Sequence, residues 1–239
     1  MTTYTSIVTV SFRSAGNHYT YKVSAIFTNS KGQVTKGGAK TTKAAKYLTA
    51  GSISSLSNTS SGIYIKWPKV TGATGYYVYR KASSASSYTL VKTITGVGTT
   101  SYTDTAVKSS NNTTYTYYTQ PYFKNSSRAI TKAGYSTKAI VRLVAPAISS
   151  LTNSSSKTMT VKWGAKSGVT GYQVQYSASS SFASGNKTLT ITGASSSSKV
   201  IASLTKGKTY YVRIRTYKTV NGTTYYSAWS TVKSVKISK

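Results

Sequence analysis

The chain has 239 residues, and its 31 Lys and Arg residues face one acidic residue and one His, which gives a formal net charge of +30. The single carboxylate, Asp104, excludes a paired acid/base site within the chain, and one His without any Cys excludes a structural zinc site or a thiol nucleophile. We therefore expect a non-enzymatic protein with no catalytic residues, no metal ligands and no cofactor.

The first 47 residues contain three apolar, Tyr-rich runs, at 4–12, 19–27 and 35–47, which predict three strands. His18 comes just before the second run and is expected in a solvated turn. Three strands are half a sandwich, and their inner face needs a cover. Two explanations are open: the segment is a piece of a longer surface protein, or strands of another chain complete residues 1–47.

From residue 48 onward the sequence repeats itself at a spacing of 95 or 96 positions. The matching segments are S-I-S-S-L-S-N at 52–58 with A-I-S-S-L-T-N at 147–153, I-Y-I-K-W at 63–67 with M-T-V-K-W at 159–163, and T-G-Y-Y-V-Y-R at 74–80 with T-G-Y-Q-V-Q-Y at 170–176. A partial copy at the front is indicated by Y-T-Y at 19–21, which matches Y-T-Y at 115–117. The repeat predicts a partial unit at 1–47 and complete units at 48–144 and 145–239.

Within each complete unit, apolar residues alternate with polar ones at every second position, as in the runs 63–67 and 159–163. Turn sequences separate such runs, among them T-G-A-T-G at 71–75 and V-N-G-T at 220–223. Alternation of this kind is typical of antiparallel strands with one face in the core and one in water. The fold class is therefore predicted as all-β, with a buried Trp on an early strand of each sandwich.

The same residues resemble a known family. Trp67 and Trp163, the two T-G-Y-x-V runs, and K-G-K-T-Y-Y-V-R-I-R-T-Y at 206–217 followed by Y-Y-S-A-W-S at 225–230 are similar to the fibronectin type III domain, in particular the tandem versions on Gram-positive bacterial cell-surface proteins. The resemblance implies tandem immunoglobulin-like sandwiches of seven strands, two complete and one partial at the N-terminus. It also implies an extracellular or cell-surface protein that spaces, displays or binds and has no universal active site.

Asp104 lies near the end of a predicted strand, in S-Y-T-D-T, and is expected to be a structural turn or cap carboxylate. A Ser/His/Asp triad would have to join it to His18 of a different unit, so we expect no such site. No apolar run approaches the length of about 18 residues that a membrane helix needs, and neither a signal nor an anchor is expected in this chain.

The best candidate site is the outer face of the larger sheets. The strand at 210–217 should present alternate residues to solvent beside Gln173 and Gln175, and the preceding unit should present Gln120 among tyrosines. The candidate polyanion- or glycan-binding residues are Tyr77, Tyr79, Arg80, Tyr118, Tyr122, Tyr211, Arg213, Arg215, Tyr217, Lys233 and Lys236. Stacking on aromatic rings and charge from the bases would suit a sugar or a phosphate. The alternative is that Tyr and Arg pair across strands to protect a solvated sheet.

The charge itself predicts salt-sensitive binding to polyanions such as DNA, RNA, teichoic acid or sulfated glycans. The first hypothesis is a cationic binding or spacer module of a bacterial surface. The alternative is a nucleic-acid-binding or cargo-delivery protein, natural or engineered for high charge, because an ordinary domain of this length carries roughly 25 to 30 acids. Most of the bases are Lys, a point charge that favours contacts to phosphate or sulfate over reading of bases.

Overall fold

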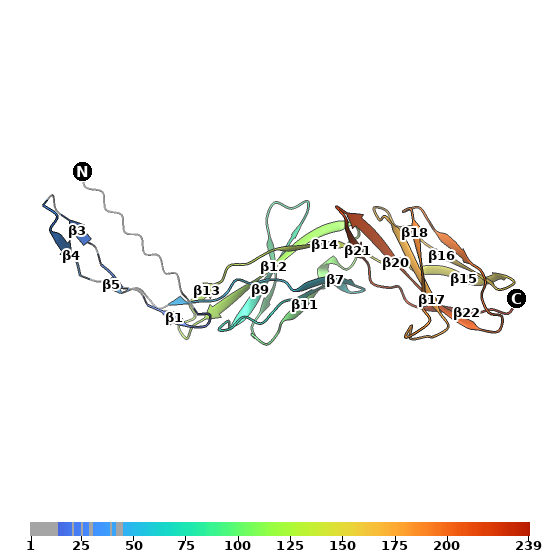
Figure 1. Cartoon of the computed structure of the whole chain (residues 1–239), viewed down its shortest axis with the longest axis horizontal. Helices are drawn as coiled ribbons and strands as arrows, with labels where there is room; N and C mark the ends of the chain where they lie inside the picture. Colours follow the sequence, from blue (N-terminus) through green and yellow to red (C-terminus); the bar gives the residue numbers. More distant parts are fainter. Residues whose placement is uncertain (1–13, 21, 25, 29–30, 39, 42–44) are drawn as a thin grey trace.

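The computed structural model describes residues 14–20, 22–24, 26–28, 31–38, 40–41 and 45–239. In these residues the secondary structure is almost entirely β, with one short 3₁₀ helix, η1 (Thr105–Val107). The second and third units are sandwiches that follow one another along the long axis of the molecule, with the front segment at the far end (Figure 1). The expected all-β class is confirmed.

The described part of the front segment is a two-stranded antiparallel ribbon. β1 (His18–Tyr19) pairs with β6 (Ala45–Lys46), β2 (Lys22–Val23) pairs with β5 (Lys40–Thr41), and β3 (Ile26–Thr28) pairs with β4 (Val34–Lys36). The expected strands at 19–27 and 35–47 are thus two arms of one ribbon, each broken into short pieces. The expected strand at 4–12 lies outside the described residues, so completion of residues 1–47 stays a prediction.

The second unit is a sandwich of two sheets. The smaller sheet has the order β11 (Ser101–Asp104), β8 (Gly62–Lys66), β7 (Ser55–Thr59). The larger sheet has the order β10 (Thr89–Ile94), β9 (Gly75–Ala82), β12 (Thr113–Lys124), and the free edge of β12 is shared by β13 (Ile130–Lys132) and β14 (Lys138–Arg142). The seven strand positions implied by the resemblance are present, with the last strand divided in two.

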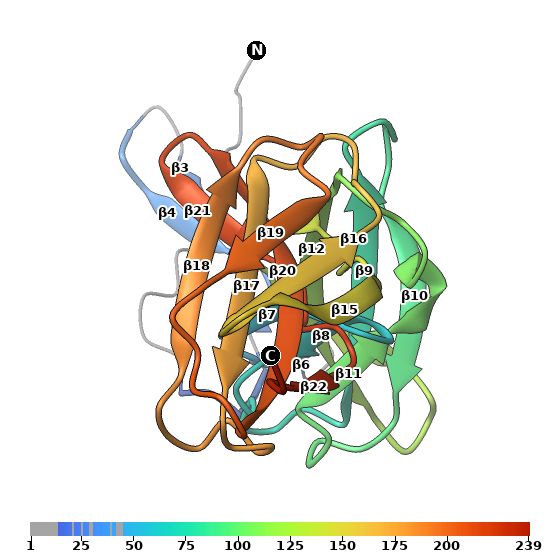
Figure 2. The same ribbon diagram turned by 90° about the vertical axis from the view of Figure 1, so that its right-hand side faces the viewer.

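The third unit repeats this architecture, and Figure 2 views the molecule from the end at which it lies. Its smaller sheet has the order β15 (Ile148–Ser155), β16 (Thr158–Trp163), β19 (Ser198–Ile201). Its larger sheet has the order β18 (Lys187–Thr192), β17 (Gly171–Ser177), β20 (Thr209–Val220), and β21 (Thr223–Tyr226) and β22 (Lys233–Lys236) share the edge of β20. Two sandwiches of the same strand order in tandem are therefore the observed fold.

Each sandwich has its own core, and the alternating runs supply it. The apolar members of runs 63–67 and 159–163 are buried, and both early Trp residues pack against the Tyr of the T-G-Y run. Ring centroids are 5.5 Å apart for Trp67 and Tyr76 and 5.4 Å apart for Trp163 and Tyr172. The large aromatic rings compensate for the low content of aliphatic residues, because each ring buries a large apolar area.

The glycine of the T-G-Y run is required by a close backbone approach. A Cβ atom on Gly75 would lie 2.0 Å from the carbonyl oxygen of Ile94, and one on Gly171 would lie 2.1 Å from that of Ile191. Both contacts are to the neighbouring edge strand, which could not move away without breaking its ladder. The sequence repeats T-G-Y because only glycine allows β9 and β17 to begin beside these strands.

Candidate polyanion-binding surface

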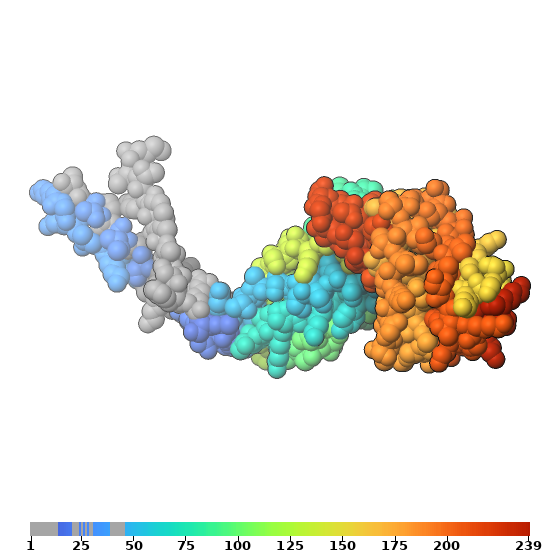
Figure 3. Space-filling view, turned by 45° about the vertical axis from the view of Figure 1, so that its right-hand side comes forward, coloured from blue at the N-terminus to red at the C-terminus, as the bar shows by residue number. Residues whose placement is uncertain are grey.

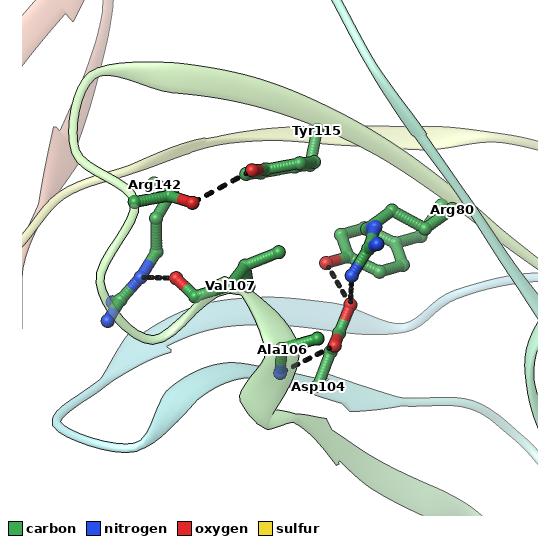
Figure 4. Close-up of polar contacts among 8 residues, drawn as sticks. Arg80, Asp104, Ala106, Val107, Tyr115 and Arg142 are labelled. Carbon is green, nitrogen blue, oxygen red and sulfur yellow. Dashed lines mark hydrogen bonds and ion pairs between the residues drawn. The ribbon is translucent and has the colours of Figure 1, made fainter. Parts of the chain in front are cut away.

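The only acid of the chain is buried in the second sandwich (Figure 4). The Oδ2 atom of Asp104 accepts hydrogen bonds from Arg80 Nη1 at 2.7 Å and from the hydroxyl of Tyr117 at 2.9 Å. Its Oδ1 atom accepts a bond from the backbone N–H of Ala106 at 3.2 Å and so caps η1. The expected structural cap is confirmed, and the carboxylate is 0% exposed, so it cannot offset charge at the surface.

Arg80 is therefore a correction to the candidate surface. It follows Tyr76 and Val78 at every second position of β9, so its side chain lies on the inner face of the sheet, where it pairs with Asp104. The guanidinium is largely covered, with a side-chain exposure of 22%. A cation held by its own carboxylate is not available to an external anion.

His18 is also placed differently from expectation. It lies in β1 rather than in a turn, and its ring packs edge-on against Phe123 of the second sandwich with centroids 5.4 Å apart. The ammonium group of Lys46 lies 4.4 Å from the centroid of the same Phe123 ring. His18 thus helps to seat the base of the ribbon, and it is not among the hydrogen-bond partners of Asp104.

The outer face of the second sandwich is a stack of tyrosines from β9, β12 and the segments before β10 and after β13. The predicted neighbouring of β9 and β12 is confirmed, and in the observed register Tyr118 is opposite Tyr79 and Gln120 is opposite Tyr77. Ring centroids are 4.6 Å apart for Tyr79 and Tyr118, 3.7 Å for Tyr118 and Tyr135, and 4.5 Å for Tyr77 and Tyr122. We refer to Tyr77, Tyr79, Tyr88, Tyr118, Tyr122 and Tyr135 as the tyrosine stack.

Two members of the stack are less accessible than the alternation predicts. Tyr118 is 7% exposed and Tyr122 is 4% exposed, because neighbouring rings cover them. The cover over Tyr118 includes Tyr135, which is itself 46% exposed and which the strand pattern does not indicate. Burial, together with the nearby rings of Tyr135 and Tyr79, raises the pKa of Tyr118 to about 12. Tyr135 is thus the accessible aromatic ring of this face.

Lysines border the tyrosine stack. The ammonium group of Lys132 lies 5.0 Å from the centroid of Tyr77, and that of Lys81 lies 5.3 Å from the centroid of Tyr88. These are cation–π distances, at which a ring and a cation attract one another. The face therefore combines rings with cations at its margin, which is an arrangement suited to a sugar or a nucleotide that carries negative charge.

The arginines on the outer face of the third sandwich already have partners. Arg213 Nε donates to Gln175 Oε1 at 2.8 Å, and Arg215 donates to Gln173 Oε1 from Nε at 2.9 Å and from Nη2 at 2.7 Å. The predicted neighbouring of β17 and β20 is confirmed, and in the observed register Gln175 is opposite Arg213 and Gln173 is opposite Arg215. Burial lowers the pKa of both guanidinium groups.

Aromatic rings cover the two guanidinium groups. Arg213 lies 4.1 Å from the ring centroid of Phe182 and 4.7 Å from that of Trp229, and Arg215 lies 4.0 Å from that of Tyr226 and 4.3 Å from that of Trp229. Tyr217 packs beside Tyr226 and is 9% exposed. This arrangement corresponds to the alternative in which Arg and Tyr protect a solvated sheet.

Apart from Arg128, which is exposed in the turn between β12 and β13, the accessible cations of the sandwiches are lysines. Lys233 and Lys236, both predicted for the surface, are exposed on β22, while Tyr211 beside them is half-buried. Exposed lysines lie on both sheets and on the turns of both sandwiches. They are Lys66, Lys69, Lys92, Lys108, Lys124, Lys132, Lys138, Lys157, Lys162, Lys187, Lys199, Lys206, Lys208, Lys233, Lys236 and Lys239.

The fold defines the class of protein as a tandem immunoglobulin-like β-sandwich protein. A family model described as the fibronectin type III domain matches residues 144–233. That segment belongs to the fibronectin type III family, and the second sandwich has the same strand order. Domains of this family are binding or spacer modules. Among the described residues, no helix is long and apolar enough to cross a bilayer.

Two solved structures are similar to this chain. The chain is 19% identical to the FN1–FN3 domains of chicken CNTN1, with 94% of this chain and 77% of that chain covered and a TM-score of 0.35. It is 17% identical to a segment of two fibronectin type III domains from chicken tenascin, with 79% and 98% covered and a TM-score of 0.35. No curated protein sequence matches the chain.

Proposed function

We propose that this chain is a cationic binding and spacer module of an extracellular or cell-surface protein, and that it associates electrostatically with polyanions. One observation carries the proposal: the only carboxylate side chain is buried in an ion pair with Arg80. The exposed lysines therefore have no acidic side chain to face. Their summed field attracts any polymer of phosphates or sulfates, such as teichoic acid, a sulfated glycan or a nucleic acid.

The chemistry of the cations favours contacts to the backbone of such a polymer. Arginine is the residue that reads bases through two parallel hydrogen bonds. Arg213 and Arg215 already donate to Gln175 and Gln173 and are covered by aromatic rings, and Arg80 is paired with Asp104. Apart from the exposed Arg128, the accessible cations are lysines, which act as point charges on phosphate or sulfate. Sequence-specific reading of a nucleic acid is therefore not favoured.

The spacer part of the proposal rests on the contact between the two sandwiches, which abut one another in Figure 3. Asn58 at the end of β7 donates from Nδ2 to the carbonyl oxygens of Val141 and Tyr226, both at 2.9 Å, and so bridges the two units. Asn111 of the second unit donates to the carbonyl oxygen of Ser167 at 3.2 Å. Direct hydrogen bonds of this kind restrict the angle between neighbouring domains, as a spacer requires.

A salt series with several polyanions tests the proposal. Binding of the whole chain to duplex DNA, to a heparin-like glycan and to teichoic acid would be measured by titration, with an uncharged dextran as control. If about six anionic groups are contacted, affinity should fall about a thousandfold between roughly 50 and roughly 200 mM salt. Affinity that does not change with salt, or equal binding to dextran, would contradict the proposal. The strongest ligand at physiological salt separates a wall or glycan partner from a nucleic acid.

A further inference from the structure

The two sandwiches differ at corresponding ends, and the difference falls on the residues that make the joint. In the second sandwich this end faces the third. It carries Asn58 at the end of β7, Asn111 before β12 and Arg142 at the end of β14. Besides the Asn bonds described above, Arg142 donates to the carbonyl oxygens of Val107 at 3.1 Å, Lys108 at 2.7 Å and Thr59 at 3.0 Å. These groups hold the backbone of the joint.

One repeat later, the same positions have different residues. Asn153 takes the place of Asn58 and still clamps the chain that leaves the last strand, because its Oδ1 atom accepts from the N–H groups of Ser238 and Lys239, both at 2.9 Å. Asn111, however, corresponds to Lys206, and the buried Arg142 corresponds to Ile237, which is fully buried. The end that seats a neighbouring domain in the second sandwich thus presents cations in the third.

A further lysine lies in the turn between β15 and β16. This two-residue turn is Ser156–Lys157 and corresponds to Ser60–Ser61 of the second sandwich, so Lys157 takes the place of a serine. Lys157 has a φ of 53°, a conformation that favours glycine or asparagine. Its backbone is held there from both sides, since its N–H donates to Lys239 at 3.0 Å and its carbonyl oxygen accepts from Leu204 at 2.9 Å.

Backbone bonds draw three segments together at this end, which lies beside the C-terminal residue in Figure 1. Gly207 donates to Ile237 at 2.7 Å and Ile237 donates to Lys208 at 2.9 Å, so the turn before β20 is fixed to the end of β22. A shallow hollow of about 560 Å³ lies between the turns, lined by Lys157, Ser203, Leu204, Thr205 and Lys206. We refer to Lys157, Ser203, Lys206, Lys208 and Lys236 as the lysine end; all five residues are exposed.

The side-chain charges at the lysine end are all positive. The only acidic side chain is buried in the other sandwich. Lys157 and Lys206 line the hollow, Lys208 and Lys236 lie on the two segments bonded together beside it, and backbone hydrogen bonds fix these segments. Tyr210, at the start of β20, reflects this field: its pKa is lowered by hydrogen bonds from Thr205 and also by the charges of Lys187 and Lys208. A hollow lined by cations of one sign concentrates anions.

We infer that the lysine end is a binding site for a tetrahedral oxyanion, a phosphate or a sulfate, carried by a polymer. The ammonium groups of Lys157, Lys206 and Lys208 supply the charge, and the hydroxyl of Ser203 supplies a donor at the rim of the hollow. The inference rests on the proposed function and adds a location to it. Diffuse attraction by the whole surface brings the polymer to the molecule, and the lysine end fixes one of its anionic groups.

A charge-matched pair of variants tests the site in the whole chain. One variant carries Lys157→Asn, Lys206→Ser and Lys208→Ser, and the control carries Lys66→Ser, Lys69→Ser and Lys92→Ser on the second sandwich, where these lysines are also exposed. Affinity for a heparin oligosaccharide and for inorganic polyphosphate would be measured separately at physiological salt. Loss of about three contacts should weaken binding about a hundredfold for the first variant. The control should lose less than about fivefold.

The outcomes separate the site from the proposed function. Equal losses of affinity in the two variants would overturn the proposed site at the lysine end and leave the proposal of general polyanion binding intact. An unmodified chain that binds neither probe at low salt would overturn both proposals. Preference for the oligosaccharide or for polyphosphate distinguishes a sulfate from a phosphate source. Backbone amide shifts of the unmodified chain on titration give a readout independent of variant folding: they should be largest at 157 and 203–208, and shifts spread evenly over the surface would overturn the site.

Discussion

At the residue scale, the only acidic side chain of the molecule is buried at a position where it stabilises the fold. Asp104 joins Arg80, Tyr117 and the start of η1, so a single carboxylate satisfies a guanidinium, a buried hydroxyl and a backbone N–H. An arginine on the inner face of β9 would otherwise be a partly buried charge without a partner, which is costly. The remaining acid is thus explained by stability rather than by chemistry.

The substitution Asp104→Asn tests this role. The amide oxygen can still accept from Ala106, but the charge that balances Arg80 is lost, and we expect the second sandwich to lose about 3 kcal/mol of stability. Denaturant unfolding of the whole chain, followed at ring signals of Tyr76 and Tyr172 by NMR, reports the two sandwiches separately. Only the second should be affected.

A double variant is the control for that substitution. Arg80→Met together with Asp104→Asn removes the unpaired cation, and it should recover a large part of the lost stability, since replacing both partners of a buried pair is often close to neutral. If Asp104→Asn unfolds at the same denaturant concentration as the unmodified chain, the ion pair does not stabilise the fold.

The sequence predicts Asp104 as a structural carboxylate but does not identify its partner. The signal was present, because the alternation that buries Tyr76 and Val78 also places Arg80 on the inner face. Because Arg80 is charged, it was instead predicted to lie on the exposed face of the sheet. An arginine at a core position in a chain with one acid indicates where that acid must lie.

At the element scale, the sequence predicts which residues of the larger sheets share a face. It does not predict which side chains cover that face. Strand alternation correctly placed Tyr118 on one face with Tyr79, and Gln173 on one face with Arg215, because a period of two fixes which residues share a face. The rings that cover these faces, Tyr135 and Trp229, come from segments between strands, where no period applies. The surface predicted as open is therefore partly closed by side chains from its own loops.

The tyrosine stack gives a prediction for high pH. Burial and the neighbouring rings raise the pKa of Tyr118 to about 12, so its ring-carbon NMR signal should titrate near that pH. Tyr135→Phe keeps the cover but removes an ionisable neighbour, and Tyr135→Ala removes both. The pKa should therefore fall modestly in the Phe variant and further in the Ala variant, toward the ordinary value of about 10. No change in the Ala variant would show that Tyr135 does not cover Tyr118 in solution.

The sign of the stability effect follows from the same pKa. Because the folded value lies above the unfolded value, the folded chain holds the proton of Tyr118 more tightly. This contribution to stability is complete below about pH 10 and is lost as the pH rises toward about 12. Ionisation of Tyr118 should therefore not change the stability of the second sandwich within the physiological range of pH.

At the scale of the whole molecule, the repeat predicted the two sandwiches but not the joint between them. The joint depends on side chains in turns, and its key members differ between the copies: Arg142 in one corresponds to Ile237 in the other. Arg142 is 1% exposed, and it donates to backbone carbonyl oxygens and to the amide oxygen of Asn58, at 3.3 Å, rather than to a carboxylate. Burial lowers its pKa. A contact to backbone carbonyl groups cannot be predicted from the sequence, since every residue carries such a group.

The substitution Asn58→Ala should loosen this joint. It removes the bonds from Asn58 Nδ2 to the carbonyl oxygens of Val141 and Tyr226, and it removes the oxygen that accepts from the N–H of Leu143. Of these three bonds, only the one to Tyr226 reaches the third sandwich beyond the linker. Asn153→Ala is the matched control, because Asn153 makes the same clamp within the third sandwich and bridges to no other unit in the described structure. Each variant should lose about 1–3 kcal/mol in its own sandwich.

Only Asn58→Ala should also change the motion between sandwiches. Rotational correlation times from NMR relaxation, measured for each sandwich, should be alike in the unmodified chain and in Asn153→Ala, and should shorten in Asn58→Ala as the domains begin to move separately. A spacer that presents the lysine end to a distant polymer depends on this stiffness. Equal correlation times in all three proteins would mean that the other contacts of the joint, including the bond from Asn111 to Ser167, set the angle, and that Asn58 contributes stability without contributing rigidity.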